Sequence, residues 1–166
     1  MTSDVTPEVE IREADFSVDE EYRRLRGAGG HNGACVLFSG LVREHGACGD
    51  LQSLELEHYP GMTERAIESM IDEASRRFRI RGARVVHRVG TLAPGDQIVL
   101  VVVTSAHRGD AFAACEFLMD YLKTQAPFWK KEQRPDGSAE WVDARVADDA
   151  ALVRWGLASG NAAQRR

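Results

Sequence analysis

The sequence is poor in cysteine and in long apolar runs, and each shortage excludes a class of protein. Its three cysteines, Cys35, Cys48 and Cys115, lie far apart without a CxxC pair, so the sequence encodes neither a disulfide framework nor a local zinc site. No apolar run approaches the roughly 20 residues that a membrane-spanning helix needs. The first residues lack the basic start and apolar core of a secretory signal. We therefore expect a reduced, cytoplasmic protein without a metal site or a membrane span.

Excess positive charge is also missing. The formal net charge is −5, whereas proteins that bind the nucleic-acid backbone normally present a net basic face. The sequence contains no glycine-rich dinucleotide fingerprint and no phosphate loop. Nucleic acid is therefore not an expected partner, and any anion-binding site must be a local cluster of cations.

The length and the apolar content suit one domain. With 166 residues, 43% of them hydrophobic, the chain can bury a substantial core. We expect this domain to span residues 11–146. We also expect a disordered N-terminus at residues 1–10 and a frayed, alanine-rich tail at residues 147–166.

The apolar periodicity predicts an α+β protein with a largely antiparallel sheet. The irregular order of strands and helices is not the alternation typical of a parallel sheet. Thr63 is a plausible cap for the first long helix. The turn at residues 94–96 favours antiparallel pairing of the strands on either side of it. The expected strands are 33–43, 54–58, 84–89, 97–105, 128–133 and 140–145, and the expected helices run from 63 to 78 and from 107 or 108 to 126.

One lysine lies on each side of the C-terminal end of the second predicted helix. Pro127 ends this helix because proline lacks an amide donor and disfavours helical geometry in the residue before it. Lys123 therefore belongs to the last helical turn and Lys130 to the strand that follows. Side chains alternate along a strand, so Lys130 and Glu132 should share one face while Lys131 points to the other.

His107 and Arg108 fall where the same helix begins. Free backbone amides and the positive end of the helix dipole favour phosphate or carboxylate there, and a guanidinium adds paired hydrogen bonds. The alternative is a solvated arginine beside a histidine that caps a loop, and a lysine in a last turn needs no function beyond complementing the dipole. Spacing alone leaves both interpretations open. His58 and His87 fall inside strand patterns and are assigned no chemistry.

Longer motifs connect this chain to a known family. The strings LELEHYPGMTE, HRVGTLAPGDQIVLVVVTSAHR and MDYLKTQAPFWKKE, followed by WVDAR, occur in this order between residues 54 and 145, within a resemblance that covers about residues 33–145. Together they resemble the large, catalytic subunit of molybdopterin synthase, the MoaE family. The resemblance implies an α/β hammerhead fold and a sulfurtransferase of molybdenum cofactor biosynthesis.

The resemblance also implies the substrate and the partner. The substrate would be cyclic pyranopterin monophosphate, and the product molybdopterin with its dithiolene. Two sulfurs would arrive as a thiocarboxylate at the C-terminal Gly-Gly of a small ubiquitin-like subunit. Large subunits would form a central dimer within a heterotetramer, and no cofactor is implied.

The family motifs assign roles by position. They imply that Lys123 and Lys130 are catalytic and that Arg145 reaches the site of the opposing subunit. Many relatives carry a lysine where this chain has Leu41, which matters only if that side chain touches substrate. The implied substrate-binding residues are Leu41, Val42, Arg43, His107, Arg108, Lys123, Lys130, Lys131, Glu132 and Arg145.

Clustered cations suit such a reaction. Opening a cyclic phosphate, attack by a thiocarboxylate and loss of a carboxylate all develop negative charge and need proton transfer. Lys123 could act as an acid or base, or form a transient covalent link to the partner's C-terminus. Two non-catalytic alternatives are a binding module that keeps only the anion pocket and a subunit that only docks a ubiquitin-like partner. The presence of both lysines favours the enzyme.

Overall fold

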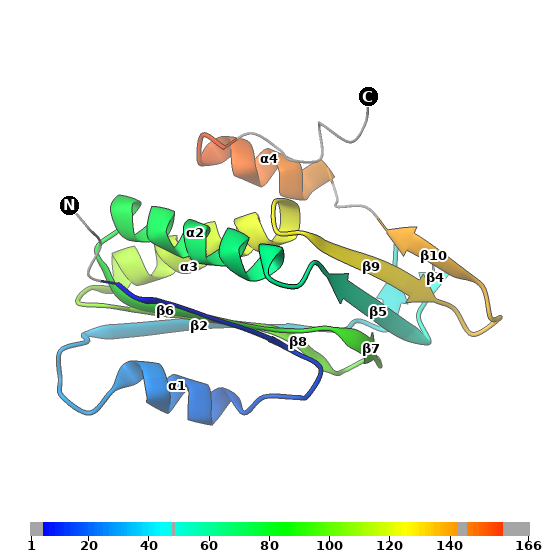
Figure 1. The fold of residues 1–166 in the computed structure, drawn as a ribbon, viewed down its shortest axis with the longest axis horizontal. Coiled ribbons are helices and arrows are strands. Elements are labelled where there is room, and N and C mark those ends of the chain that lie inside the picture. The colour runs from blue at the N-terminus through cyan, green and yellow to red at the C-terminus, as the bar shows by residue number, and fades with distance from the viewer. Residues whose placement is uncertain (1–4, 48, 143–145, 158–166) are drawn as a thin grey trace.

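Two four-stranded sheets, one two-stranded sheet formed by β3 and β4, and four helices make up the described part of the computed structural model, which covers residues 5–47, 49–142 and 146–157 (Figure 1). The elements are β1 (Pro7–Arg12), α1 (Val18–Arg26), β2 (Ala34–Leu41), β3 (His45–Gly46), β4 (Gly49–Asp50), β5 (Ser53–His58), α2 (Met62–Arg77), β6 (Ile80–Arg88), β7 (Gly90–Leu92), β8 (Gln97–Ser105), α3 (Arg108–Thr124), β9 (Phe128–Gln133), β10 (Ala139–Val142) and α4 (Val146–Arg154).

The first sheet has the order β1-β6-β8-β2 and lies between α1 on one face and α2 with α3 on the other (Figure 1). The pairs β6–β8 and β8–β2 are antiparallel, and β1 pairs parallel to β6. The predicted α+β class and the antiparallel pairing across the turn at residues 94–96 are thereby confirmed.

The apolar run of β8 is explained by burial on both faces. Val101 and Val103 belong to the main core under α2 and α3, whereas Leu100 and Val102 belong to a second cluster beside α1. Since successive side chains of a strand point to opposite faces, a strand covered on both sides needs apolar residues at every position. β8 therefore joins the two layers of the molecule.

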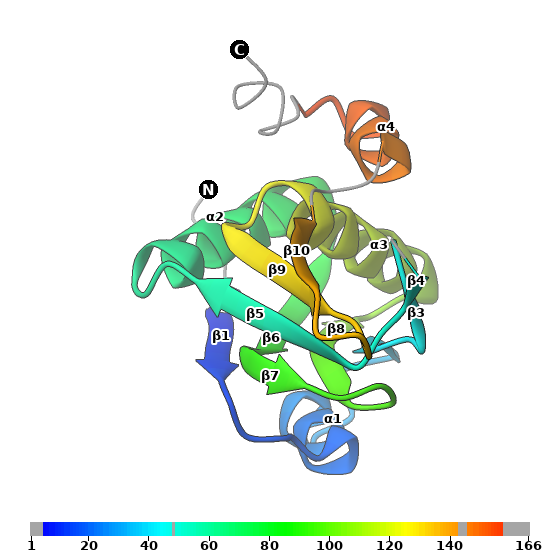
Figure 2. The same ribbon diagram turned by 90° about the vertical axis from the view of Figure 1, so that its right-hand side faces the viewer.

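The second sheet has the order β10-β9-β5-β7, and all its pairs are antiparallel (Figure 2). It joins the first sheet through a small cluster formed by Val42, Leu54, Leu56 and Leu92. β9 begins and ends where the alternation predicts, while β10 ends at Val142, and residues 143–145 lie outside the described ranges.

The start of α2 differs from the expectation. Gly61 is the cap residue, and its amide donates to Glu64 Oε2 at 2.6 Å. Thr63 lies two residues further along, as the second residue of the helix, and is fully buried. Its hydroxyl accepts from the Tyr59 amide and donates to the Pro127 carbonyl, both at 3.0 Å. The threonine thus ties the first turn of α2 to the segment that enters β9.

The chain outside the central region is more ordered than predicted. Residues 7–10 are not disordered, because they belong to β1, whose backbone pairs with β6 and whose Val9 and Ile11 pack on the main core. The composition of residues 7–12 gives little sign of this pairing, because its partner strand lies more than seventy residues away.

The alanine-rich tail likewise contains a packed helix, α4, at Val146–Arg154. Leu152 is fully buried, and the Trp155 ring meets Phe78 and Phe117 edge-on at centroid distances of 5.8 and 5.5 Å. The Trp155 indole N–H donates to Asp120 Oδ2 at 2.6 Å. The prediction of a frayed tail is therefore wrong for residues 147–157.

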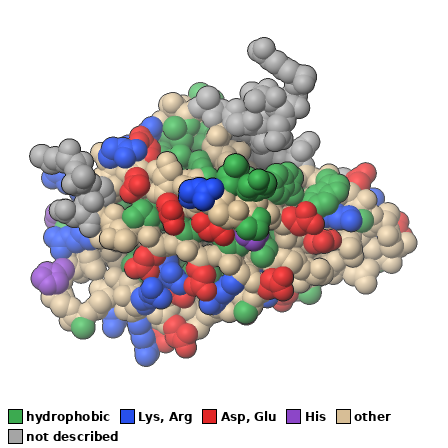
Figure 3. Space-filling view, viewed as in Figure 1, with side chains coloured by type: hydrophobic (Ala, Val, Ile, Leu, Met, Phe, Trp, Pro, Cys, Tyr) green, Lys and Arg blue, Asp and Glu red, His purple; other side chains and the backbone are tan. Residues whose placement is uncertain are grey.

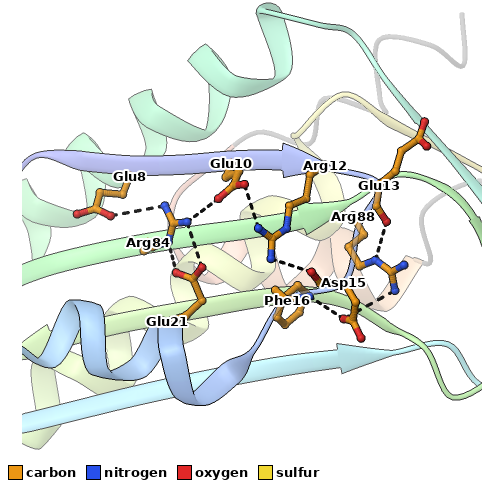
Figure 4. A network of polar contacts seen from close by, with 9 residues as sticks. All are labelled: Glu8, Glu10, Arg12, Glu13, Asp15, Phe16, Glu21, Arg84 and Arg88. Carbon is orange, nitrogen blue, oxygen red and sulfur yellow. Dashed lines mark hydrogen bonds and ion pairs between the residues drawn. The ribbon is translucent and has the colours of Figure 1, made fainter.

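A buried arginine joins β1, β6 and α1. Arg84 is only 5% exposed, and it contacts carboxylates from two other elements (Figure 4). Its Nη2 lies 2.6 Å from Glu10 Oε2, its Nη1 lies 3.5 Å from Glu8 Oε2, and its Nε donates to the buried Glu21. A buried guanidinium with several charge-assisted hydrogen bonds is paired well enough to remain ionised.

Removal of this arginine should destabilise the fold strongly. In Arg84→Ala, the Glu21 carboxylate stays buried without its partner, so we expect the free energy of unfolding to fall by about 3–5 kcal/mol in urea titrations. Arg23→Ala is the matched control, because it breaks an exposed pair with Asp19 and should cost less than about 1 kcal/mol. Equal losses in the two variants would contradict a special role for the buried network.

Candidate active site

The junction between α3 and β9 brings two lysines near each other. α3 ends at Thr124, the amide of Gln125 still donates to the Tyr121 carbonyl at 2.8 Å, and β9 begins directly after Pro127. Lys123 is exposed in the last turn of α3, and Lys130 is half-buried in β9. The predicted positions of both lysines relative to the helix end are confirmed.

His87 forms the floor beneath this junction. The buried ring of His87, on β6, stacks on Phe128 with a centroid distance of 3.8 Å and an interplanar angle of 16°. Its Nδ1 lies 2.8 Å from the carbonyl oxygen of Arg88. A carbonyl can only accept, so Nδ1 carries the proton and Nε2 is left as an acceptor.

The electrostatics of His87 show which cations surround it. Burial lowers the pKa of His87 to about 3, and the nearby charges of Lys130, Lys123 and His58 lower it further in the same direction. The ring is therefore neutral at physiological pH. It was assigned no chemistry from the sequence, and its strand pattern gives no sign that the charges of two lysines, one on α3 and one on β9, act on it.

The face of β9 that carries Lys130 points inward. Lys130 pairs in register with the buried Leu56, and Glu132 pairs with the buried Leu54. Lys131 lies on the opposite face, with its Nζ 5.6 Å from the ring centroid of Trp141. The predicted alternation is confirmed, and the structure does not bring Lys131 to the face of β9 that carries Lys130.

Directly after β2, Arg43 is exposed whereas the preceding residue, Val42, is buried. Val42 is buried, its amide donates to the Asp96 carbonyl at 2.9 Å, and its carbonyl accepts from the Gly95 amide at 2.8 Å. Its backbone groups therefore have partners within the chain, and a substrate contact at Val42 stays a prediction. Leu41 and Arg43 are exposed and line an open hollow together with Val42, residues 44–45, Pro94 and Gly95.

Glu132 is engaged with the backbone of a neighbouring hairpin. Its buried carboxylate accepts from the Ala47 amide, at 2.9 Å for Oε1 and 3.1 Å for Oε2. Ala47, four residues after Arg43, therefore contacts β9, the strand that also carries Lys130.

The other predicted cations lie far from the lysines within one chain. His107 is the cap residue of α3 and Arg108 its first residue, and both are exposed. A rise of about 1.5 Å per residue puts Arg108 about 22 Å from Lys123 along the helix axis. Figure 1 shows α3 beginning at the end of the molecule away from β9. A single chain therefore does not bring Arg108 and Lys123, both implied substrate-binding residues, into one site, because a straight helix separates them.

Three further observations bound the site. Arg145, the remaining predicted contact, lies outside the described residues. Within the described ranges, no group of three or more histidines, cysteines and carboxylates could hold a metal ion. No helix in that part of the chain is long and apolar enough to cross a membrane.

The chain is similar to known proteins over most of its length. The profile of the family described as MoaE protein matches residues 11–125. The molybdopterin synthase catalytic subunit of Ralstonia nicotianae is 53% identical over 156 residues, which are 94% of this chain and 88% of that protein.

Solved structures show the same likeness. The molybdopterin biosynthesis MoaE protein of Burkholderia ambifaria superposes with a TM-score of 0.78 at 52% identity, over 91% of this chain and 99% of that one. A protein–protein complex of subunits 1 and 2 of the molybdopterin-converting factor from Helicobacter pylori contains a chain with a TM-score of 0.66 at 20% identity, over 83% and 90% of the two chains. The second likeness is one of fold alone.

The buried neutral histidine should shape the acid stability of the protein. Its pKa is about 3 in the fold against 6.5 for the free side chain, so between these values the unfolded state binds a proton that the folded state does not. Stability is thus lost as the pH falls below 6.5, by up to about 1.4 kcal/mol per pH unit. Urea unfolding between about pH 7 and pH 5 should show this loss.

His87→Phe, although less stable overall, should lack this part of the pH dependence. His31→Phe serves as the control, because His31 is exposed and its replacement should leave the wild-type slope. Parallel curves for wild type and His87→Phe would show that the ring is not held neutral.

Proposed function

Because this chain belongs to the MoaE family, we infer that it is the catalytic subunit of a molybdopterin synthase, a sulfurtransferase of molybdenum cofactor biosynthesis. The observation that connects this family to chemistry in the present chain is that Lys123 and Lys130, on either side of the α3–β9 junction, are both near enough to the buried ring of His87 for their charges to lower its pKa. The cysteines Cys35 and Cys115 carry free thiols, which suits a reducing compartment, and we propose the cytoplasm.

We propose cyclic pyranopterin monophosphate as the substrate and molybdopterin as the product, without a cofactor. In each sulfur transfer, a thiocarboxylate sulfur attacks a substrate carbon and forms a thioester, while a C–O bond at that carbon breaks and its oxygen leaves with the phosphate of the opened ring or, after protonation, as water. Water then cleaves the acyl–sulfur bond, which leaves the sulfur on the substrate and a carboxylate on the partner. Lys123 and Lys130 can stabilise the negative charge that develops and supply protons. The neutral His87 beneath them adds no third positive charge.

The sulfur donor in this proposal is a small ubiquitin-like subunit with a C-terminal Gly-Gly thiocarboxylate. The two-subunit complex from Helicobacter pylori supports a protein partner of this kind. Figure 3 shows hydrophobic side chains gathered where α2 begins beside β5 and β9, and Tyr59, Met62 and Trp129 are exposed there. A patch of this kind suits protein docking. We propose that the partner docks at this patch and that its extended tail reaches Lys123 and Lys130.

A second copy of the chain would complete the site. Arg108 cannot reach Lys123 within one chain because α3 separates them. β2 is an edge strand of its sheet, and its Leu37 and Phe38 are 38% and 40% exposed. An exposed apolar edge strand is a surface suited to pairing with another chain.

Antiparallel pairing of two β2 strands would place the required cations together. Ala34, at the start of β2, pairs with Ser105, two residues before His107, whereas Leu41, at its end, precedes Arg43. A twofold axis across β2 sets the start of one strand beside the end of the other. His107 and Arg108 of one chain would then lie near Arg43 of the other. We propose this dimer as the centre of a heterotetramer with two small subunits.

Substitutions of lysines should show that residues on the inner face of β9 and at the end of α3 are needed for activity, whereas the outer face of β9 is not. We expect Lys123→Ala and Lys130→Ala each to lower product formation by about 10²- to 10⁴-fold, because each removes a proton donor and a positive charge at the reacting atoms. Lys131→Ala is the matched control on the opposite face and should remain within a few-fold of wild type. The assay mixes enzyme, thiocarboxylated small subunit and pterin precursor and measures molybdopterin. Full turnover by Lys123→Ala would overturn the assignment.

Mixed dimers should reveal whether one site draws on two chains. A Lys123→Ala chain and an Arg108→Ala chain are coexpressed with different tags and purified through both. If the site is shared, one of its two copies is intact, and about half of wild-type activity is expected although each homodimer is impaired. A chain carrying both substitutions, paired with a wild-type chain, is the reciprocal control and should be inactive. The reverse pattern would show that each site lies within one chain.

A further inference from the structure

We propose that Glu132 is a positioning residue that holds the β3–β4 hairpin, and with it Arg43, against the strand that carries Lys130. The family resemblance implies that Glu132 binds substrate, and the geometry points to a different role. This inference rests on the proposed function for its catalytic consequence, but the contact itself can be tested without any turnover.

The contact joins two distant parts of the chain. Glu132 is 7% exposed, and both of its carboxylate oxygens face the amide of Ala47, 85 residues earlier in the sequence. A hydrogen bond from an amide to a buried carboxylate is among the stronger ones in proteins, and loss of the carboxylate leaves the amide without that acceptor. The side chain is therefore occupied by the hairpin.

Gly46 shows how closely the two parts approach. A Cβ at this position would lie 2.2 Å from Glu132 Oε2 and 2.4 Å from its carboxyl carbon. Gly46 is not among the glycines with positive φ, so its backbone conformation is open to other residues. Space for the carboxylate, and not backbone freedom, is what requires glycine here. Gly46 and the Glu132 carboxylate therefore pack directly against each other. We call this contact the Gly46–Glu132 clamp.

The clamp is one of two anchors around Arg43. On one side, Val42 is held by its hydrogen bonds to Asp96 and Gly95. On the other side, the clamp holds Ala47, and the Gln52 amide donates to the Gln133 carbonyl at 2.8 Å. Arg43 lies between these anchors, so its backbone has little freedom to move away from β9.

The same strand presents Lys130 two residues earlier and on the same face as Glu132. At about 3.3 Å per residue, the two Cα atoms are about 7 Å apart. A shift of the clamp would therefore change the distance between Arg43 and Lys130 directly. The negative carboxylate of Glu132 would repel an anionic substrate, whereas a carboxylate that orders a binding arginine assists it.

Four variants test this role. Glu132→Ala removes the acceptor, Glu132→Gln keeps an acceptor oxygen of the same reach, and Gly46→Ala displaces the carboxylate without altering it. Glu140→Gln is the control, because Glu140 pairs with Glu132 across β9 and β10 but is exposed, with a surface ion pair to Arg134. Each variant is examined as the full chain by amide hydrogen exchange at Ala47 and by kcat and KM for the pterin precursor.

We expect Glu132→Ala and Gly46→Ala to speed exchange of the Ala47 amide by about tenfold to a hundredfold, in line with the loss of one charge-assisted hydrogen bond. Both should raise KM for the pterin precursor by about tenfold, a larger change than in kcat, because Arg43 is the displaced group. Glu132→Gln should restore both measurements to within a few-fold of wild type, and Glu140→Gln should match wild type.

Two results would overturn the inference. One is a Glu132→Gln protein as inactive as Glu132→Ala while its Ala47 amide stays protected, which would assign the carboxylate to the chemistry. The other is unchanged exchange at Ala47 in both Glu132→Ala and Gly46→Ala. If Glu132→Ala does not fold, the Gly46→Ala and Glu132→Gln pair still decides. A wild-type chain that makes no product would refute the proposed function, yet the exchange data would still decide whether the clamp exists.

Discussion

Burial of β8 on both faces is the constraint on which the rest of the structure depends. Val101 and Val103 pack in the main core under α2 and α3, and Leu100 and Val102 pack in the second hydrophobic cluster beside α1. Because β8 pairs with β2 on one side and β6 on the other, it also sets where those strands end. The end of β2 leads to Arg43, and the end of β6 carries His87. The positions of both groups therefore follow from one apolar strand.

α3 imposes the second constraint, since a helix is a rigid spacer. Its last turn delivers Lys123 to the entry of β9, and its first residue carries Arg108 to the opposite end of the molecule. A single chain thus presents its predicted cations at two separate ends of α3. The proposed dimer would bring such ends together across the exposed edge of β2.

Sequence patterns predicted the central elements well and the outer ones poorly. The helices at α2 and α3 and the strands β8 and β9 have strong apolar periodicity, which is a local property of the chain. β1 was missed because its parallel partner β6 is distant in sequence, and α4 because alanine-rich composition hides the few side chains, such as Leu152, that pack. The cap of α2 was misplaced because Thr63 makes its hydrogen bonds to other segments.

The sequence by itself determined how Lys123, Lys130 and Lys131 are arranged around Pro127. A proline ends a helix and a strand alternates its faces whatever surrounds them. Only the tertiary structure decided that His87 stacks on Phe128 beside the α3–β9 junction, that Glu132 faces the Ala47 amide, and that Arg108 lies far from Lys123. These relations join residues on different elements, and their distances depend on how sheets and helices pack, which no local spacing in the chain encodes.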